Sequence, residues 1–398
     1  MPDAPISEIA ETIDSHLQHG NVQAALELAR SGREVHPESL EISIRLGVAL
    51  AAAGARQDAI AVLEETHGIA LGECAPTETL IFAKHSLAYA LNGARQFARS
   101  APLLREALEL GGRNPNMLAA AVKAFYRTGE IEEARRWGGE ALKERDAEVD
   151  AAGKTFESLN AVRPRQFDPA RRKHNIIAYS LFGEDRYYHD CAIVNARIAM
   201  ASYPDFTPRY YCGEEVPKIV LDELVLQKAD VKIVKNRVSP WEGLFWRFWA
   251  FDDPEVDVVL VRDVDSPLTP RERIAVEDWL YNSDTPFHVM RDHPLHCTPM
   301  MAGLWGGFAG LLPPMKPLTR RFLGQVSNRY ADQTLLQFIV WPRIREIALA
   351  HDSQFDLRNS RDFPAWGRVT NGVHVGWSWP LSRGKLERTD FLGSVTPH

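Results

Sequence analysis

The sequence has few cysteines and no long apolar run. Its four cysteines never occur in the Cys-x-x-Cys spacing, which excludes a zinc site of that type and gives no sign of a disulfide framework. No apolar stretch approaches the roughly 18 residues that a membrane-spanning helix needs. The first residues show neither the basic segment nor the apolar segment that is typical of a signal peptide. We therefore expect a cytoplasmic protein without a membrane span.

An excess of positive charge and a glycine-rich nucleotide motif are also missing. The formal net charge of −7 at pH 7 argues against nucleic acid as the main partner. The absence of a Gly-x-Gly-x-x-Gly pattern argues against a dinucleotide-dependent dehydrogenase. The chain has 398 residues, of which 45% are hydrophobic. It is therefore long enough for two or three domains with a sizeable core.

Four short phrases recur within the first 150 residues. They read GNVQAA, GARQDA, GARQFA and GEIEEA, and they start at Gly20, Gly54, Gly93 and Gly129. The glycines are 34, 39 and 36 residues apart. Prolines follow the first three phrases in step, at Pro37, Pro76 and Pro115. Amphipathic patterns of helical period lie between these positions.

A period near 34 residues with this layout resembles tetratricopeptide repeats. In that arrangement glycine turns the chain between paired helices, alanine lets them approach closely, and proline starts the next pair. The longer spacings predict short insertions, one of them near residues 68–73. Residues 1–150 are thus predicted to form an all-α solenoid, a surface that binds peptides or proteins. The alternative is a solenoid that only supports the second domain or forms a dimer.

Residues 151–173 are basic and contain prolines, which predicts a linker. Residues 174–398 then form the second domain. Its first part alternates strand and helix patterns, with strands expected at 175–181, 209–212 and 231–234 and helices at 187–201 and 217–228. This order predicts an α/β domain with a Rossmann-like mixed sheet and helices on both faces.

The most informative stretch of the second domain is a buried strand that ends in two acidic residues. Val258 to Val261 are four consecutive β-branched or apolar residues, and Asp263 and Asp265 follow them. In an open α/β sheet, ligands bind at the carboxyl ends of the strands. Two carboxylates within about 4 Å repel by roughly 4 kcal/mol near a protein surface. A divalent cation between them, Mn²⁺ or Mg²⁺, would remove that repulsion and attract phosphates.

Residues 242–251 are rich in aromatic side chains, which predicts a buried helix under the sheet. Arg247 lies in their midst, and a buried charge needs a partner. The aspartates at the end of the next strand are its natural partners. Downstream, Thr269 and Glu272 form a capping box, so Glu272 is predicted to cap a helix and not to take part in catalysis.

An arginine-bearing helix followed by a strand that ends in Asp-x-Asp resembles the GT-A fold of nucleotide-sugar glycosyltransferases. The stretches at 288–294 and 303–307 add to the likeness, which spans about residues 174–380. The resemblance implies that Asp263 and Asp265 hold Mn²⁺ or Mg²⁺, and that Asp263 also contacts the donor. The ion would offset charge on the departing nucleotide diphosphate. The alternative is that the two aspartates only form ion pairs with Arg247 or Arg262.

The same resemblance implies further site residues. Candidates for contact with the nucleotide sugar are Ser180, Phe182, Arg247, Asp263, Arg291, Gly303 and Trp305. Trp305 is an equally good core residue. Asp292 is a candidate sugar ligand or general base, and otherwise part of a hydrogen-bonded turn. Asp332 is a candidate for sugar binding or acceptor activation, and otherwise a carboxylate favoured by a helix N-terminus. His351 is the expected third metal ligand, with His374 as the alternative.

The predicted activity is therefore a metal-dependent transfer of sugar from a nucleotide-diphosphate sugar to a protein or glycan acceptor that the repeats recruit. A different class of function is an interaction scaffold whose GT-A-like domain is degenerate. A nucleotidyltransferase or hydrolase on the same sheet is a third option. The absence of a glycine-rich phosphate loop near residues 180–185 counts against the nucleotidyltransferase. The pattern specifies neither the sugar nor the oligomeric state.

Overall fold

A computed structural model describes residues 5–151, 159–160, 165–326, 328–365 and 373–379. The chain divides into two compact units. The repeat unit comprises residues 1–152 with the short segments 294–299 and 326–328. The sheet unit comprises the rest of the chain, including the described part of the predicted linker. In that part, Asn160 donates its backbone N–H to the Leu311 carbonyl at 2.8 Å.

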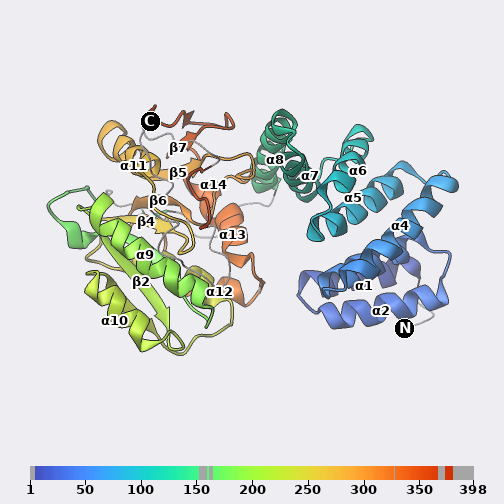
Figure 1. Ribbon diagram of the computed structural model, residues 1–398, viewed down its shortest axis with the longest axis horizontal. Coiled ribbons are helices and arrows are strands. Elements are labelled where there is room, and N and C mark those ends of the chain that lie inside the picture. Colours follow the sequence, from blue (N-terminus) through green and yellow to red (C-terminus); the bar gives the residue numbers. More distant parts are fainter. Residues whose placement is uncertain (1–4, 152–158, 161–164, 327, 366–372, 380–398) are drawn as a thin grey trace, which may run out of the picture. The chain divides into compact units, whose positions relative to one another are not determined.

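The described residues of the repeat unit form eight helices that stack in antiparallel pairs (Figure 1). They are α1 (Ile6–Gln18), α2 (Val22–Val35), α3 (Leu40–Ala52), α4 (Arg56–Gly72), α5 (Thr77–Gly93), α6 (Phe97–Glu109), α7 (Pro115–Thr128) and α8 (Ile131–Ala151). Each helix packs on its neighbours in sequence, and α1 packs on α3 and α3 on α5. A continuous apolar core results, since a single pair cannot bury its own hydrophobic face. The predicted helical solenoid is confirmed.

The turns show why the period is close to 34 residues. Gly20, Gly54 and Gly129 adopt positive φ angles of 76°, 84° and 87° between the paired helices, a conformation that glycine reaches without steric cost. In the third pair Arg95, with φ 61°, takes this position instead of Gly93. The turn positions are then 34, 41 and 34 residues apart. The third phrase is therefore shifted by two residues, and one insertion, within the longer α4 and α5, accounts for the irregular spacing.

Over its described residues, the sheet unit is built on an eight-stranded mixed sheet of order β3-β2-β1-β4-β6-β5-β7-β8. The strands are β1 (Asn175–Leu181), β2 (Thr207–Gly213), β3 (Asp230–Val234), β4 (Val258–Arg262), β5 (Phe287–Arg291), β6 (Leu304–Phe308), β7 (Ala348–Asp352) and β8 (Ser360–Arg361). Only β6 runs antiparallel to its neighbours among these strands. The predicted strand positions agree with these bounds to within a few residues.

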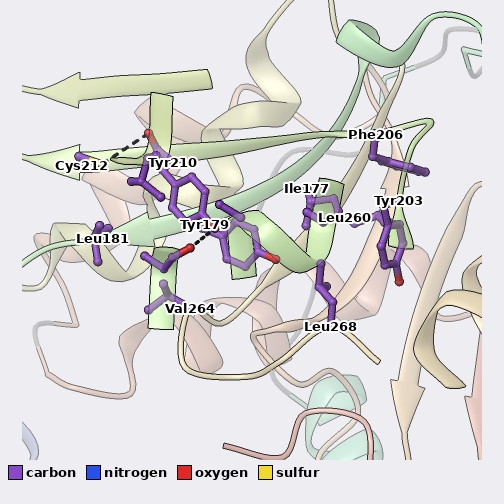
Figure 2. Packing of buried hydrophobic residues seen from close by; sticks show 14 of the residues in the cluster. Ile177, Tyr179, Leu181, Tyr203, Phe206, Tyr210, Cys212, Leu260, Val264 and Leu268 are labelled. Atoms are coloured by element: carbon purple, nitrogen blue, oxygen red, sulfur yellow. Dashed lines mark hydrogen bonds between the residues drawn. The ribbon is translucent and has the colours of Figure 1, made fainter. Parts of the chain in front are cut away.

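Helices cover both faces of the sheet. One face carries α9 (Arg186–Ser202), α10 (Lys218–Leu226) and α11 (Pro270–Asn282), and their apolar side chains form one core with the sheet. Figure 2 shows Tyr179 of β1 and Tyr210 of β2 in that core, with ring centroids 4.7 Å apart. The 3-10 helix η2 (Glu242–Asp252) also packs against β1 and β4, and α12 (Met315–Leu323) packs on η2.

The described part of the sheet unit also contains four short helical segments. The predicted helix at residues 331–340 continues to residue 344 as α13 (Ala331–Leu335), the π-helical η3 (Leu336–Val340) and α14 (Trp341–Ile344). Pro342 lies within this continuous helical segment, directly after the π-helical turn, and it lacks the N–H that a regular α-helix would use there. A 3-10 turn, η1 (Arg172–His174), leads into β1.

Candidate functional site

The candidate site lies at the carboxyl ends of β1 and β4. The chain runs from β1 outward to β2 and β3, and then returns to place β4 on the other side of β1. Such a reversal of strand order opens a crevice at the carboxyl edge of an α/β sheet, and ligands bind there. Asp263 and Asp265 follow β4 directly, and Ser180 and Phe182 lie at the end of β1. The topology therefore brings the predicted acidic pair to the expected edge.

Arg247 of η2 joins three predicted site residues. Its backbone N–H donates to Ser180 Oγ at 3.0 Å. Its Nη1 donates to Asp263 Oδ1 at 2.6 Å, and its Nη2 donates to Asp332 Oδ2 at 2.9 Å. The Arg247 and Asp332 side chains are only 7% and 9% exposed, so the bond between them lies in a region of low dielectric, whereas the bond to Asp263 is partly open to solvent. The prediction that this arginine pairs with an aspartate after β4 is confirmed.

Asp263 keeps one carboxylate oxygen available. Its side chain is 41% exposed, and its Oδ2 has no hydrogen-bond partner within the described part of the chain. Gly303 makes room for this oxygen, because a Cβ at Gly303 would lie 2.1 Å from Asp263 Oδ2. The sequence predicts Gly303 as a contact of the nucleotide sugar. In the structure the group that approaches is the carboxylate of Asp263.

Asp265 lies close enough to Asp263 for the charge of one carboxylate to affect the other. Burial raises the pKa of Asp265, and the negative charge of Asp263 raises it further, while a hydrogen bond with Ser378 opposes the shift. The Asp265 carbonyl also accepts the backbone N–H of Trp379 at 3.0 Å. Because a neighbouring carboxylate disfavours the charged form of Asp265, a cation bound between the two would stabilise that charge.

Asp332 and Gln333, at the start of α13, contact Arg247 and the loop before Gly303. Burial raises the pKa of Asp332, the Asp263 charge raises it further, and Arg247 opposes both. Gln333 Oε1 accepts the Ala302 backbone N–H at 3.1 Å, and its Nε2 donates to the Met300 carbonyl. The pair at the start of α13 thus fixes Arg247 with one side chain and the loop before Gly303 with the other.

Phe182 forms an apolar wall beside this cluster. It is half-buried, its ring lies edge-on to Trp246 at 5.8 Å, and it packs so closely on Gly243 that a Cβ there would meet the ring at 2.4 Å. Its position at the end of β1 is compatible with the predicted contact to a donor.

Trp305 does not reach the site. It is fully buried in β6, stacks on Phe251 with ring centroids 5.0 Å apart, and meets Phe248 edge-on. No face of the indole is open to a sugar, so Trp305 is not a contact of the nucleotide sugar, and the alternative core role is the one that the structure shows. Its neighbours in the aromatic segment of η2 are buried as predicted.

Arg291 and Asp292 also have structural partners. Arg291 and Asp352 are completely buried, and Arg291 Nε donates to Asp352 Oδ2 at 2.6 Å. Asp292 accepts both Nε and Nη2 of Arg271 at 2.9 Å, and the Ser353 hydroxyl at 2.6 Å. Burial raises the pKa of Asp292, but these hydrogen bonds outweigh burial, and the pKa is lowered. Arg291 is thus not available as the expected contact of the nucleotide sugar. Asp292, a candidate sugar ligand or general base, instead has the structural role that was its alternative, in a buried ion pair with Arg271 and a hydrogen bond with Ser353.

His351 is placed away from the acidic pair. It lies on β7, which β5 and β6 separate from β4. Its Nδ1 contacts His288 Nε2 at 2.7 Å and its Nε2 contacts Asp278 Oδ2 at 3.1 Å, so both ring nitrogens are engaged. The alternative, His374, lies against His293 with ring centroids 4.1 Å apart. Within the described ranges, no three His, Cys, Asp or Glu side chains gather as a metal site. The expected third ligand is therefore not brought to Asp265.

Three residues near Asp265 were not predicted from the sequence. Besides Ser378, they are Tyr187 and Cys191 at the start of α9, whose pKa values are raised first by burial and then in part by the Asp265 charge. For Cys191 the raised value is about 12. The only signal in the sequence was the Asp185 cap before α9, whose side chain accepts the Tyr187 N–H. Ser378 follows the turn at Gly376 and gave no signal.

The acidic pair fits a divalent cation. Asp263 offers a free oxygen, and Asp265 carries a charge that its surroundings disfavour. Both are hard oxygen ligands of the kind that Mg²⁺ and Mn²⁺ prefer. Arg262, in contrast, is fully buried and donates to Glu272 Oε1 at 2.5 Å. Thr269 caps the helix as predicted, because its Oγ1 accepts the Glu272 backbone N–H at 3.2 Å. The Glu272 carboxylate does not complete the predicted capping box, since it pairs with Arg262 and Tyr203. Arg262 therefore does not compete for the acidic pair.

Comparison with known proteins concerns the repeat unit. The tetratricopeptide repeat family model matches residues 11–68. No curated protein matches the chain. A solved structure of MamA from Desulfovibrio magneticus RS-1 is 15% identical and covers 37% of this chain and 78% of that chain, with a TM-score of 0.30. YrrB, described as a TPR protein with an unusual peptide-binding site, is 14% identical and covers 36% of this chain and 71% of that chain, with a TM-score of 0.28.

None of the described helices has the length and apolar character that crossing a membrane requires.

Proposed function

We propose that this protein joins a tetratricopeptide-type interaction scaffold to a metal-dependent glycosyltransferase of the GT-A type. The family match and the helical solenoid support a protein partner for the repeat unit. Transfer of a sugar from a nucleotide-diphosphate sugar is the finer part of the proposal, and one observation carries it. That observation is the Asp263–Asp265 pair at the strand-order reversal, with one free oxygen and one disfavoured charge.

In this proposal Asp263 and Asp265 hold Mn²⁺ or Mg²⁺. The bound ion would neutralise charge that builds up on the leaving nucleotide diphosphate. Arg247 fixes the orientation of Asp263 and keeps Asp332 beside it, and this preorganisation lowers the cost of assembling the site. Asp332, with its raised pKa, is the candidate for binding a sugar hydroxyl or for accepting a proton from the acceptor.

The second candidate is a non-catalytic scaffold, and two observations favour it. The family match concerns the repeats alone, and one oxygen of Asp263 is already bound to Arg247. Under this alternative the acidic pair would be part of a structural ion-pair network, which perturbs pKa values as active sites do.

A screen of nucleotide sugars for Mn²⁺-dependent hydrolysis tests the proposal. We expect one or a few donors to be hydrolysed by the wild-type protein. Asp265→Asn should reduce this turnover at least about a hundred-fold, the range seen when an electrostatic contribution to the transition state is lost. Asp284→Asn, at an exposed aspartate outside the site, is the matched control and should retain activity. Absence of turnover with every donor, or equal turnover in Asp265→Asn, would favour the scaffold.

A further inference from the structure

A cavity lies at the amino ends of the strands, opposite the carboxyl ends that carry Asp263 and Asp265. A cavity of about 490 Å³ opens where β1, β2 and β3 begin. The polar residues around it are Arg172, Lys173, Thr207, Arg209, Lys228 and Asp230. The cavity is therefore separated from Asp263 and Asp265 by the length of the strands. The candidate glycosyl-transfer site does not use it.

The charges around the cavity are unbalanced. Arg209 is neutralised, since it donates to Asp230 at 2.6 Å and to Asp253 at 2.7 Å. Arg172, Lys173 and Lys228 have no carboxylate partner among the residues that the structure describes. Three uncompensated cations thus surround one cavity in a chain whose formal net charge is −7. Such a concentration of one sign is a binding field for an anion.

The Arg172 guanidinium is held in place by the fold, whereas the Lys173 and Lys228 side chains are exposed. Arg172 Nε donates to the Phe206 carbonyl at 2.8 Å and its Nη2 contacts Met200 Sδ at 2.9 Å. Thr207 Oγ1 donates to the Arg172 carbonyl at 3.1 Å and ties η1 to β2. Lys228 has a left-handed φ of 61° in the turn between α10 and β3, a conformation that costs a lysine about 1–2 kcal/mol. Lys228 thus occupies a backbone conformation that glycine would adopt at a lower steric cost.

We propose that this cavity binds the phosphate group of an anionic ligand. Phosphate oxygens accept hydrogen bonds from a guanidinium and from two ammonium groups at once, which is stronger than any neutral pairing available to these side chains. The cavity is large enough for a phosphate monoester or diphosphate. A phospholipid headgroup has the same chemistry. Val225 and Leu226, 59% and 71% exposed beside Lys228, are aliphatic groups that could enter a lipid surface.

Calorimetric titration with inorganic pyrophosphate tests the site. EDTA is present throughout, so that the Asp263–Asp265 pair, which would need a divalent ion, does not contribute. We expect saturable binding by wild-type protein that weakens as NaCl rises from about 50 mM to about 300 mM. Lys173→Ala combined with Lys228→Gly should weaken it at least about ten-fold. Lys228→Gly also relieves the left-handed backbone, so a loss of binding cannot be attributed to unfolding.

Lys235→Ala, an exposed lysine that does not line the cavity, is the control and should bind as wild type. A wild-type protein that does not bind pyrophosphate, and does not sediment with vesicles, overturns the proposal. Equal binding by the double variant overturns it as well. Failure of this site would leave Mn²⁺-dependent turnover unaffected, so the two proposals fail independently.

Sedimentation with vesicles identifies the source of the phosphate. Vesicles of phosphatidylglycerol and phosphatidylcholine are compared with vesicles of phosphatidylcholine alone. Binding only to the anionic vesicles, lost in the lysine double variant and in Val225→Ser with Leu226→Ser, supports the site with a lipid headgroup as its ligand. Pyrophosphate binding without vesicle binding supports the site with a soluble phosphorylated ligand.

Discussion

Arg247 shows how single residues define the candidate site. Its guanidinium connects carboxylates from the β4 end and from the start of α13, and without it Asp332 would be a buried and uncompensated charge. Breaking such a pair by removing one partner typically costs about 3–5 kcal/mol. The position of Asp263 therefore depends on the same side chain that stabilises the unit.

Gly303→Ala is expected to disturb Asp263 directly. The new Cβ would lie 2.1 Å from Asp263 Oδ2 and 2.8 Å from its backbone nitrogen, so backbone as well as side chain must move. We expect the free energy of unfolding in urea to fall by about 1–3 kcal/mol. Gly68→Ala in α4, where a Cβ meets nothing within 4 Å, is the control and should be neutral or slightly stabilising. A Gly303→Ala protein as stable as wild type would contradict this packing.

Asp265→Asn is expected to stabilise the metal-free protein at neutral pH. The folded state raises the pKa of Asp265, by burial first and by the Asp263 charge second. A raised pKa means that the charged form is disfavoured in the folded state. The cost is therefore present above the folded pKa and is relieved as pH falls through it. Removing the charge should therefore increase the free energy of unfolding at pH 7.

The measurement is urea unfolding in EDTA over a series of pH values. The advantage of Asp265→Asn should shrink as the solution becomes more acidic, and Asp284→Asn should show no such trend. A variant that is less stable than wild type at pH 7 would show that the carboxylate is stabilised in its charged form. A gain in stability together with a loss of turnover is the pattern expected of a functional residue.

At the scale of elements, the repeat turns show how one position is used by two residue types. Glycine takes the left-handed position in three of the four helix pairs, and Arg95 takes it in the other. Ser100 then occupies the buried place that alanine fills in the other pairs, and it is completely buried. Its hydroxyl donates to Asn92 Oδ1 at 2.6 Å, which satisfies the polar group within the helix contact.

Arg95→Gly is expected to stabilise the repeat unit. The substitution removes the steric cost of a left-handed arginine but adds the entropy cost of glycine in the unfolded chain. The net gain should be about 0.5–1 kcal/mol in urea unfolding. Gly54→Ala, at φ 84°, is the reciprocal variant and should lose a similar amount. If Arg95→Gly were destabilising, the arginine side chain would have a stabilising role that its backbone conformation does not reveal.

At the scale of the whole molecule, the two units should respond differently to ligands. The protein has separate cores in the repeat unit and the sheet unit, and two-state unfolding is not expected of such a chain. A nucleotide diphosphate with Mn²⁺ at about 100 times its dissociation constant stabilises the state it binds by about 2.7 kcal/mol. Only the transition of the sheet unit should move, by roughly 5–10 °C.

Differential scanning calorimetry measures both transitions in the full chain. Asp265→Asn should abolish the shift, and Gly68→Ala in the repeat unit should retain it. A protein whose transitions are both insensitive to Mn²⁺ and to every nucleotide diphosphate would be the non-catalytic scaffold. A shift of the repeat-unit transition alone would show that the nucleotide binds the repeat unit, which would contradict the proposed site in the sheet unit.

The sequence by itself determined the elements. The repeat period, the buried strand of valines before Asp263, the aromatic segment around Arg247 and the cap at Thr269 are all local patterns, and local patterns follow from the periodicity of helices and strands. The tertiary structure decided which charges meet. Arg247 joins Asp263 and Asp332, whereas Arg271 takes Asp292 and Arg291 takes Asp352. The physical reason is the strand order, since β6 and β5 lie between β4 and β7 and keep His351 from Asp265.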